Sequence, residues 1–178
     1  MASGGDDEAA LPLRSVTDLA EGGKKRYEYA DGSWIEADAD GETRKHYRAN
    51  TKTLVEQLPN GVVRQTTRGD PDTVLTVFPN GVKTQVRGTV TISHMPGGVV
   101  VQEDTGPKPY KATKFPDGFE MVELADGTSV DRSPDGSVRT AYPDGHVVTT
   151  YADGSKQIED ADGGNVRLVP APAKAEEW

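Results

Sequence analysis

Short runs rich in Val, Thr, Ile and Tyr, interleaved with charged residues, alternate along the chain with glycine-containing pairs. In these pairs, glycine follows an aspartate, an asparagine or another glycine. The last six pairs, from Asp117-Gly118 to Asp162-Gly163, are spaced by nine residues without exception. The seven residues between successive pairs are a typical strand length, and Val, Ile, Thr and Tyr favour strands. The pattern therefore predicts an all-β chain, an antiparallel meander of about a dozen short strands.

The glycine pairs are the predicted turns. Most are preceded by Pro or Ala, as in Phe115-Pro116-Asp117-Gly118 and Tyr142-Pro143-Asp144-Gly145. Asn-Gly and Asp-Gly are preferred at the centre of two-residue type I′ hairpins, so we expect such a turn at each pair. Between Asn60 and Asn80 the interval is twenty residues, which leaves room for two repeat units with a degenerate turn between them.

The chain divides by composition into three segments. Residues 1–23 are predicted to be an acidic N-terminal lead, residues 24–169 the β-repeat sheet domain, and residues 170–178 a C-terminal tail. Helix competes poorly, because each glycine in a helix interior costs about 1 kcal/mol and each proline about 3 kcal/mol. Only Val16 to Glu21 could hold a short helical turn.

The expected turn type predicts which side chains share a face. In a two-residue hairpin the flanking residues pair directly, so Tyr142 should oppose Val147 and Val138 should oppose Tyr151. This register places six apolar residues on one face, where we expect them to bind a partner protein: Phe115, Leu124, Val138, Tyr142, Val147 and Tyr151. Charged residues on the same face fit poorly in a core. An open, largely single-layer sheet is therefore favoured over a β-sandwich, and a small closed barrel remains the alternative.

Composition and charge narrow the classes of function. The 178 residues carry a net charge of −9, no cysteine and three histidines. The absence of cysteine excludes disulfides, thiolate metal sites and thiol nucleophiles. The acidic balance argues against nucleic acid as a partner. No apolar stretch approaches the roughly 20 residues that span a bilayer, so no membrane partner is expected.

The search for catalytic chemistry predicts neither an enzyme nor a cofactor. His46, His94 and His146 lie in different repeats, at no spacing typical of a metal site. Each repeat supplies one aspartate, in a turn that favours aspartate for backbone reasons, which is too few for a calcium site of roughly six to eight oxygens. A flat sheet also offers no cleft that would raise the pKa of a carboxylate. We therefore expect no catalytic residue and no bound metal.

Three units carry a family resemblance: Phe115-Pro116-Asp117-Gly118, Tyr142-Pro143-Asp144-Gly145 and Tyr151-Ala152-Asp153-Gly154. Tandem units of this kind at nine-residue spacing resemble the glycine-rich G-box, or TCP-type C-terminal domain, of the CPAP family of centriole-assembly proteins. The resemblance covers about residues 26–169 and is best over 110–163. It implies a free-standing antiparallel sheet, exposed on both faces, that binds a Pro-rich segment of a partner centriolar protein and can associate end to end.

The resemblance also implies a function and a location. It indicates a non-enzymatic structural or scaffold protein of a centriole or cilium axoneme, in the cytoplasm and its cytoskeleton, which binds partner proteins through a sheet face and sheet edges. Two alternatives remain open. One is a repeat fragment of a bacterial or phage surface or fibre protein, although such repeats are usually longer. The other is a calcium-stabilised β-roll, which also has a nine-residue repeat.

Overall fold

The computed structural model describes residues 12–20, 22–39 and 44–172, and every regular element in these ranges is a β-strand. This part of the chain contains no helix long and apolar enough to cross a membrane. The chain divides into two compact units, residues 1–80 and 81–178. The division falls within the span 24–169 that the sequence predicted as one sheet domain.

The described residues of the first unit form seven strands: β1 (Leu13–Asp18), β2 (Lys25–Tyr29), β3 (Trp34–Ala37), β4 (Arg44–Arg48), β5 (Thr53–Gln57), β6 (Val63–Thr67) and β7 (Thr73–Val77). The second unit contains ten: β8 (Lys83–Arg87), β9 (Val90–His94), β10 (Val100–Asp104), β11 (Tyr110–Lys114), β12 (Glu120–Leu124), β13 (Ser129–Arg132), β14 (Val138–Ala141), β15 (Val147–Thr150), β16 (Lys156–Glu159) and β17 (Val166–Val169).

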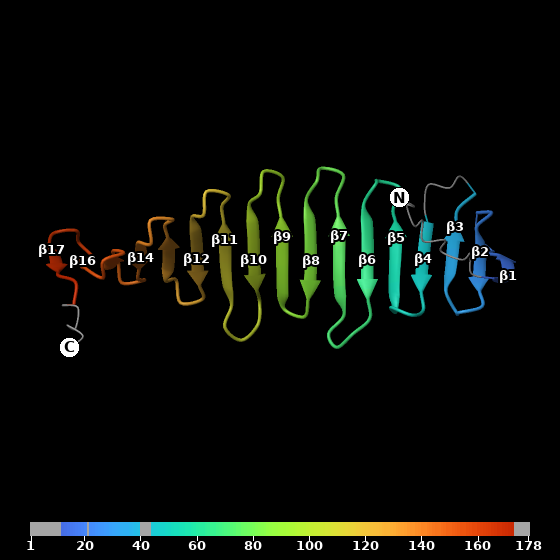
Figure 1. Cartoon of the computed structure of the whole chain (residues 1–178), viewed down its shortest axis with the longest axis horizontal. Helices are drawn as coiled ribbons and strands as arrows, with labels where there is room; N and C mark the ends of the chain where they lie inside the picture. The colour runs from blue at the N-terminus through green and yellow to red at the C-terminus, as the bar shows by residue number, and fades with distance from the viewer. Residues whose placement is uncertain (1–11, 21, 40–43, 173–178) are drawn as a thin grey trace, which may run out of the picture. The chain divides into compact units, whose positions relative to one another are not determined.

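Within each unit, every strand pairs antiparallel with its neighbours in the chain (Figure 1). The strands of a unit contact only strands that are adjacent in sequence, so neither unit closes into a barrel or stacks a second layer. The open, single-layer antiparallel meander predicted from the sequence is confirmed. The described residues hold seventeen strands rather than about a dozen, in part because β1 lies in the predicted lead and because β8 and β9 both lie between Asn80-Gly81 and Gly97-Gly98.

The N-terminal boundary is corrected by β1. This strand pairs with β2 and lies inside residues 1–23, which the sequence assigned to an acidic lead. Val16 is extended and opposes Tyr27, so the segment that could have held a helical turn begins as part of a strand. Residues 1–11 and 173–178 of the predicted lead and tail lie outside the described residues.

Single-layer architecture leaves almost no conventional core. Among the described residues the only buried hydrophobic side chain is Val62, and the buried polar ones are Ser33, Thr53 and Thr128. No described side chain is fully enclosed. Stability must therefore come from the backbone ladders and from half-buried cross-strand pairs, which each contribute roughly 0.2–1 kcal/mol.

The repeating turns differ from those expected. At the turn from Tyr142 to His146, the amide of Tyr142 donates to the carbonyl of His146, and the amide of Gly145 donates to the carbonyl of Tyr142. Gly145 has a φ of 91°, whereas Asp144 has no positive φ. This is a type I turn followed by a left-handed glycine, which forms a three-residue loop with a bulge. The expected type I′ turn, with positive φ at both aspartate and glycine, is wrong.

The extra loop residue shifts the register by one position. Ala141 opposes Val147 and Val138 opposes Thr150, in place of the expected Tyr142–Val147 and Val138–Tyr151 pairs. A slip of one residue moves a side chain to the other face of the sheet. From β11 to β16 every cross-strand pair joins two even or two odd residue numbers, so even-numbered side chains share one face and odd-numbered ones the other.

The turn aspartates have a structural role. In each repeat the aspartate Oδ1 accepts a hydrogen bond from the amide two residues further along, at 2.8 Å for Asp126, Asp135 and Asp153. This arrangement closes the bulge and explains why aspartate recurs at the position before glycine. The pKa of Asp135 is lowered by hydrogen bonds from the hydroxyl and then the amide of Ser137.

Candidate docking site

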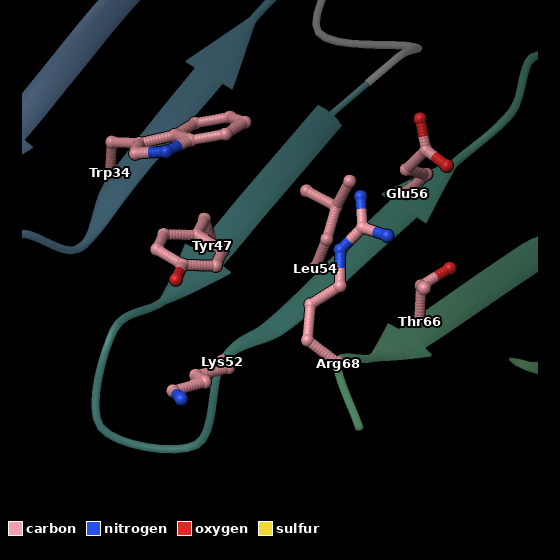
Figure 2. A pocket seen from close by; sticks show the side chains of 7 residues that line it. All are labelled: Trp34, Tyr47, Lys52, Leu54, Glu56, Thr66 and Arg68. Atoms are coloured by element: carbon pink, nitrogen blue, oxygen red, sulfur yellow. The ribbon is translucent and has the colours of Figure 1, made fainter. Parts of the chain in front are cut away.

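The first unit has a hollow on one sheet face, and its floor is a row of aromatic and aliphatic side chains. Trp34 on β3 opposes Tyr47 on β4, and Tyr47 opposes Leu54 on β5. Because opposed residues point to the same side, the three side chains form a continuous row across three strands. The rings of Trp34 and Tyr47 stack with centroids 5.9 Å apart. Figure 2 shows the hollow, which measures about 430 Å³.

Charged and polar side chains frame this row. Lys52 comes from the turn between β4 and β5, Glu56 and Thr66 from β5 and β6, and Arg68 from just beyond β6 (Figure 2). Glu56 is held by Lys45 at 3.5 Å. Arg68 pairs with Asp72 at 2.6 Å, and a hydrogen bond from the amide of Gly69, followed by that from Arg68, lowers the pKa of the Asp72 carboxyl.

Contacts from β2 hold the Trp34 ring of this row in place. The guanidinium of Arg26 lies 4.3 Å from the centroid of a Trp34 ring, a cation–π contact. Arg26 is itself held by Glu28 at 3.2 Å and by Glu36 at 3.6 Å. The indole is thus fixed between Arg26 and Tyr47 before any ligand arrives. A surface fixed in this way loses little conformational entropy on binding.

Lys52, which lines the hollow, has a strained backbone conformation. Its φ is 51°, and it is the sole described residue other than glycine with a positive φ. Its carbonyl accepts a hydrogen bond from the amide of Arg68 at 3.0 Å, which ties the turn to the end of β6. Such conformations cost roughly 1–3 kcal/mol and occur most often at functional sites.

The structure divides the six residues predicted to form one patch. Leu124 and Val138 lie on one face of the second unit and Val147 on the other. The hydrogen bonds that close their turns extend this register, which places Tyr142 on the face of Leu124, and Phe115 and Tyr151 on the face of Val147. The expectation of a single six-residue patch is wrong, because it rested on the two-residue turn. Phe115 packs on Phe119 with ring centroids 5.8 Å apart.

The exposed members of this set also have partners of their own. Tyr142 stacks on His146 with centroids 4.1 Å apart, and the hydroxyl of Tyr151 donates to Gln157 at 2.9 Å. Leu124, Tyr142 and Tyr151 are 41%, 38% and 41% exposed. They remain available to a partner, but on two faces.

The sequence pattern did not predict the hollow of the first unit. Trp34 and Tyr47 lie where the glycine pairs are irregularly spaced, so the repeat gave no register that would connect them. One signal was available in the sequence: Trp34, one of the two tryptophans of the chain, follows closely after the Asp31-Gly32 pair. Across the described ranges, no group of three or more His, Asp or Glu side chains could hold a metal ion.

These features define a class of protein: a single-layer antiparallel sheet built from aspartate–glycine hairpins, with a hollow over a row of aromatic and aliphatic side chains. No family model matches the chain, and no curated protein matches it in sequence. Solved structures do match. The chain resembles the G-box, or TCP10 domain, of the CPAP centriole-assembly family.

Three solved structures document the likeness. The wild-type TCP10 domain of Danio rerio CPAP, in complex with a peptide of Danio rerio STIL, is 27% identical with a TM-score of 0.60, covering 88% of this chain and 93% of that chain. The G-box domain of the microcephaly protein CPAP is 24% identical with a TM-score of 0.65, covering 83% and 99%. A mutant TCP10 domain of Danio rerio CPAP is 18% identical with a TM-score of 0.52, covering 89% and 99%.

Proposed function

We propose that this chain is a non-enzymatic scaffold protein of a microtubule-based organelle, a centriole or a cilium axoneme. It binds an extended, proline-containing segment of a partner protein in the hollow over Trp34, Tyr47 and Leu54. The observation that carries the proposal is this preformed aromatic row on a sheet that resembles the CPAP G-box. The Danio rerio domain was solved with a peptide of STIL, which supports a peptide segment of another protein as the partner.

The spacing of the row suits a polyproline II segment lying across the strands. Such a helix has three residues per turn and rises about 3.1 Å per residue, or roughly 9.3 Å per turn. Neighbouring strands lie about 4.8 Å apart, so side chains two strands apart are separated by roughly 9.6 Å. Prolines three positions apart would therefore meet Trp34 and Leu54, with Tyr47 between them. Aromatic-lined surfaces are the usual sites for such segments.

The binding claim is tested by calorimetry with a synthetic proline-rich peptide. Trp34→Ala and Tyr47→Ala should each weaken binding about tenfold or more, because truncated aromatic anchors are typical hot spots. The matched control is Tyr27→Ala. Tyr27 opposes Ile35, the neighbour of Trp34 in β3, and so points to the other face. Equal affinity of the Trp34 and Tyr27 variants would refute the site.

The location is tested separately by immunogold labelling of the tagged chain in ciliated cells. Label confined to centrioles or axonemal microtubules supports the scaffold role, and diffuse cytosolic label contradicts it. The Trp34→Ala variant should lose the label if the hollow recruits the protein. A Trp34→Ala variant that localises normally would separate recruitment from peptide binding.

A further inference from the structure

The two faces of the sheet in the second unit carry charges of opposite sign. Cross-strand pairing assigns the side chains of β8 to β17 either to the face of Val122 or to the face of Met121. The Val122 face, here called the basic face, carries the cations Lys83, Arg87, Lys114, Arg132, Lys156 and Arg167 against the carboxylates Asp104 and Glu120. The opposite face carries the carboxylates Glu103, Glu123, Asp131 and Glu159 against the cations Lys111 and Arg139.

Most cations of the basic face have no carboxylate partner. Arg132 pairs with Glu120 at 3.1 Å, and Asp104 accepts a hydrogen bond from the amide of Gly106 at 2.8 Å. The exposed cations without an ion pair to another described residue are Lys83, Arg87, Lys114, Lys156 and Arg167. Both cations of the opposite face, in contrast, pair with carboxylates of that face, at 3.5 Å and 3.7 Å. The basic face therefore presents positive charge that nothing on it neutralises.

The turn aspartates do not cancel this difference. They lie at the edges of the sheet, which both faces share, and each is held within its own turn. Asp117 accepts from the amide of Phe119 at 3.0 Å, and Asp135 from the amide of Ser137 at 2.8 Å. Among the described residues, no turn aspartate pairs with a cation of the basic face.

An apolar stripe crosses the basic face beside a row of these cations. Through consecutive cross-strand pairs, the stripe includes Ile92, Ala112, Val122, Val130, Val148 and Ile158. Its side chains are only partly buried, because no second layer covers the face. At about 4.8 Å between neighbouring strands, the stripe from β9 to β16 is roughly 34 Å long. Lys114 and Lys156 lie two residues along their strands from the stripe, or roughly 6.6 Å away.

These dimensions suit an amphipathic helix that lies across the strands. A sheet face, unlike a strand edge, offers no free backbone groups, so it favours a segment that satisfies its own backbone hydrogen bonds. At about 1.5 Å per residue, roughly 22 helical residues span 34 Å. A helix is about 10 Å wide, so side chains that flank its apolar stripe reach the neighbouring row of cations.

Other occupants fit this face less well. The stripe offers aliphatic side chains, whereas nucleic acid strands bind where aromatic rings stack on their bases, and the whole chain has a net charge of −9. A second copy stacked through its opposite face would make a contact that does not close on itself. That face also has only two carboxylates without an ion pair to a described residue, Glu123 and Glu159.

We propose that the basic face binds an amphipathic helix of a partner protein, in which glutamates or aspartates flank the apolar stripe. The apolar side chains of the helix pack on the stripe from Ile92 to Ile158, and its carboxylates face Lys114 and Lys156. This site goes beyond the binding of a proline-containing segment over Trp34 and uses no residue of that hollow.

The probe is a synthetic helical peptide of about three heptads, with leucines along one stripe and glutamates on both flanks, titrated into the full chain by calorimetry. Lys114→Glu and Lys156→Glu should each weaken its binding about tenfold, and added salt should weaken it further. The matched control is Lys111→Glu, which makes the same charge change on the same strand but on the opposite face. Circular dichroism verifies the fold of each variant.

Two control peptides test the chemistry of the partner. The first has lysines in place of the glutamates and should not bind, because like charges then face each other. The second has a central proline, which breaks the helix, and should bind about tenfold more weakly or less. Equal affinity of the lysine peptide would overturn the charge argument, and equal affinity of the proline peptide would overturn the helix.

The remaining outcomes decide the face and its occupant. Equal affinity of the Lys114→Glu and Lys111→Glu variants would refute the basic face. An oligonucleotide that binds there more tightly than the peptide would refute a protein partner, and a chain that sediments as an oligomer dispersed by Lys114→Glu would assign the face to a second copy. If Trp34→Ala abolishes binding while Lys114→Glu retains it, the peptide occupies the other hollow and this site is wrong. Loss in Lys114→Glu with retention in Trp34→Ala supports the basic face, whether or not the hollow over Trp34 binds its own segment.

Discussion

The ring of Pro116 packs on Gly98, the bulge glycine of the preceding turn on the same edge of the sheet. A Cβ built on Gly98 would lie 3.2 Å from Cγ of Pro116. The same relationship joins Gly127 to Pro143 and Gly118 to Pro134, at 3.6 Å in both cases. Turns on one edge therefore stack as a ladder of proline on glycine, which accounts for the Pro-Asp-Gly order of the repeats.

This ladder predicts a difference between two adjacent glycines. Gly98→Ala should be clearly destabilising, because alanine would add a steric clash with Pro116 to the cost of a left-handed conformation of roughly 1–2 kcal/mol. Gly97→Ala is the matched control, since Gly97 also has a positive φ but a Cβ there would have no neighbour within 4 Å. Urea unfolding of both variants checks the prediction. Equal destabilisation would show that the Pro116 contact contributes nothing.

The turn aspartates predict acid sensitivity. Hydrogen bonds in the folded state lower the pKa of Asp126, Asp135, Asp144 and Asp153 below the ordinary value of 3.8. The unfolded chain therefore binds more protons at low pH, so the stability from these groups is fully present above about pH 5, begins to fall near about pH 4, and is lost as the pH falls through the lowered pKa values of the folded state. Melting temperatures measured from neutral pH downward should decline in that window.

The Asp135→Asn variant tests how much a single turn carboxylate contributes to this acid sensitivity. Asparagine retains an oxygen to accept from the Ser137 amide but does not titrate. Its melting temperature should therefore decline less steeply below about pH 5 than that of the native chain. An unchanged slope would mean that this carboxylate does not contribute to the acid transition.

Substitution of Lys52 by glycine is expected to raise the stability of the chain while it weakens peptide binding. Lys52→Gly relieves a positive φ in a residue with a Cβ and should stabilise the chain by about 1 kcal/mol. It should also weaken binding of a proline-rich peptide that carries glutamates, because it removes a cation from the hollow over Trp34, Tyr47 and Leu54. Thr51→Gly is the control, since Thr51 has no positive φ. Thermal melting and calorimetry check the two effects, and a destabilised Lys52→Gly variant would contradict the prediction.

The corrected register predicts a pattern of energetic coupling. Tyr142 and Tyr151 lie on opposite faces, so the destabilisation from Tyr142→Ala and Tyr151→Ala should add within about 0.3–0.5 kcal/mol. Tyr142 and His146 stack on one face, so their alanine variants should show coupling of about 0.5 kcal/mol or more. Double-mutant cycles in urea measure both values. Strong coupling between the two tyrosines would favour the two-residue turn.

Much of the architecture can be predicted from short segments of the sequence. The nine-residue spacing of Asp-Gly pairs determined where strands β12 to β16 begin and end, because turn chemistry and strand propensity act over a few residues. The interleaving of charged and apolar residues on both faces likewise determined that no second layer covers the sheet, since charged side chains do not tolerate burial without a partner.

Register and site were decided by the tertiary structure. A segment such as Tyr142-Pro143-Asp144-Gly145 permits a two- or a three-residue loop, and the choice depends on how His146 pairs across the hairpin. That one-residue difference determines which face Tyr142 shares with Leu124 and whether Tyr151 joins them. The hollow over Trp34, Tyr47 and Leu54 likewise exists because the pairing of three strands brings these side chains into one row. Sequence alone determined the strands, whereas the contacts between strands determined the binding surface, because cross-strand neighbours are set by pairing and not by spacing along the chain.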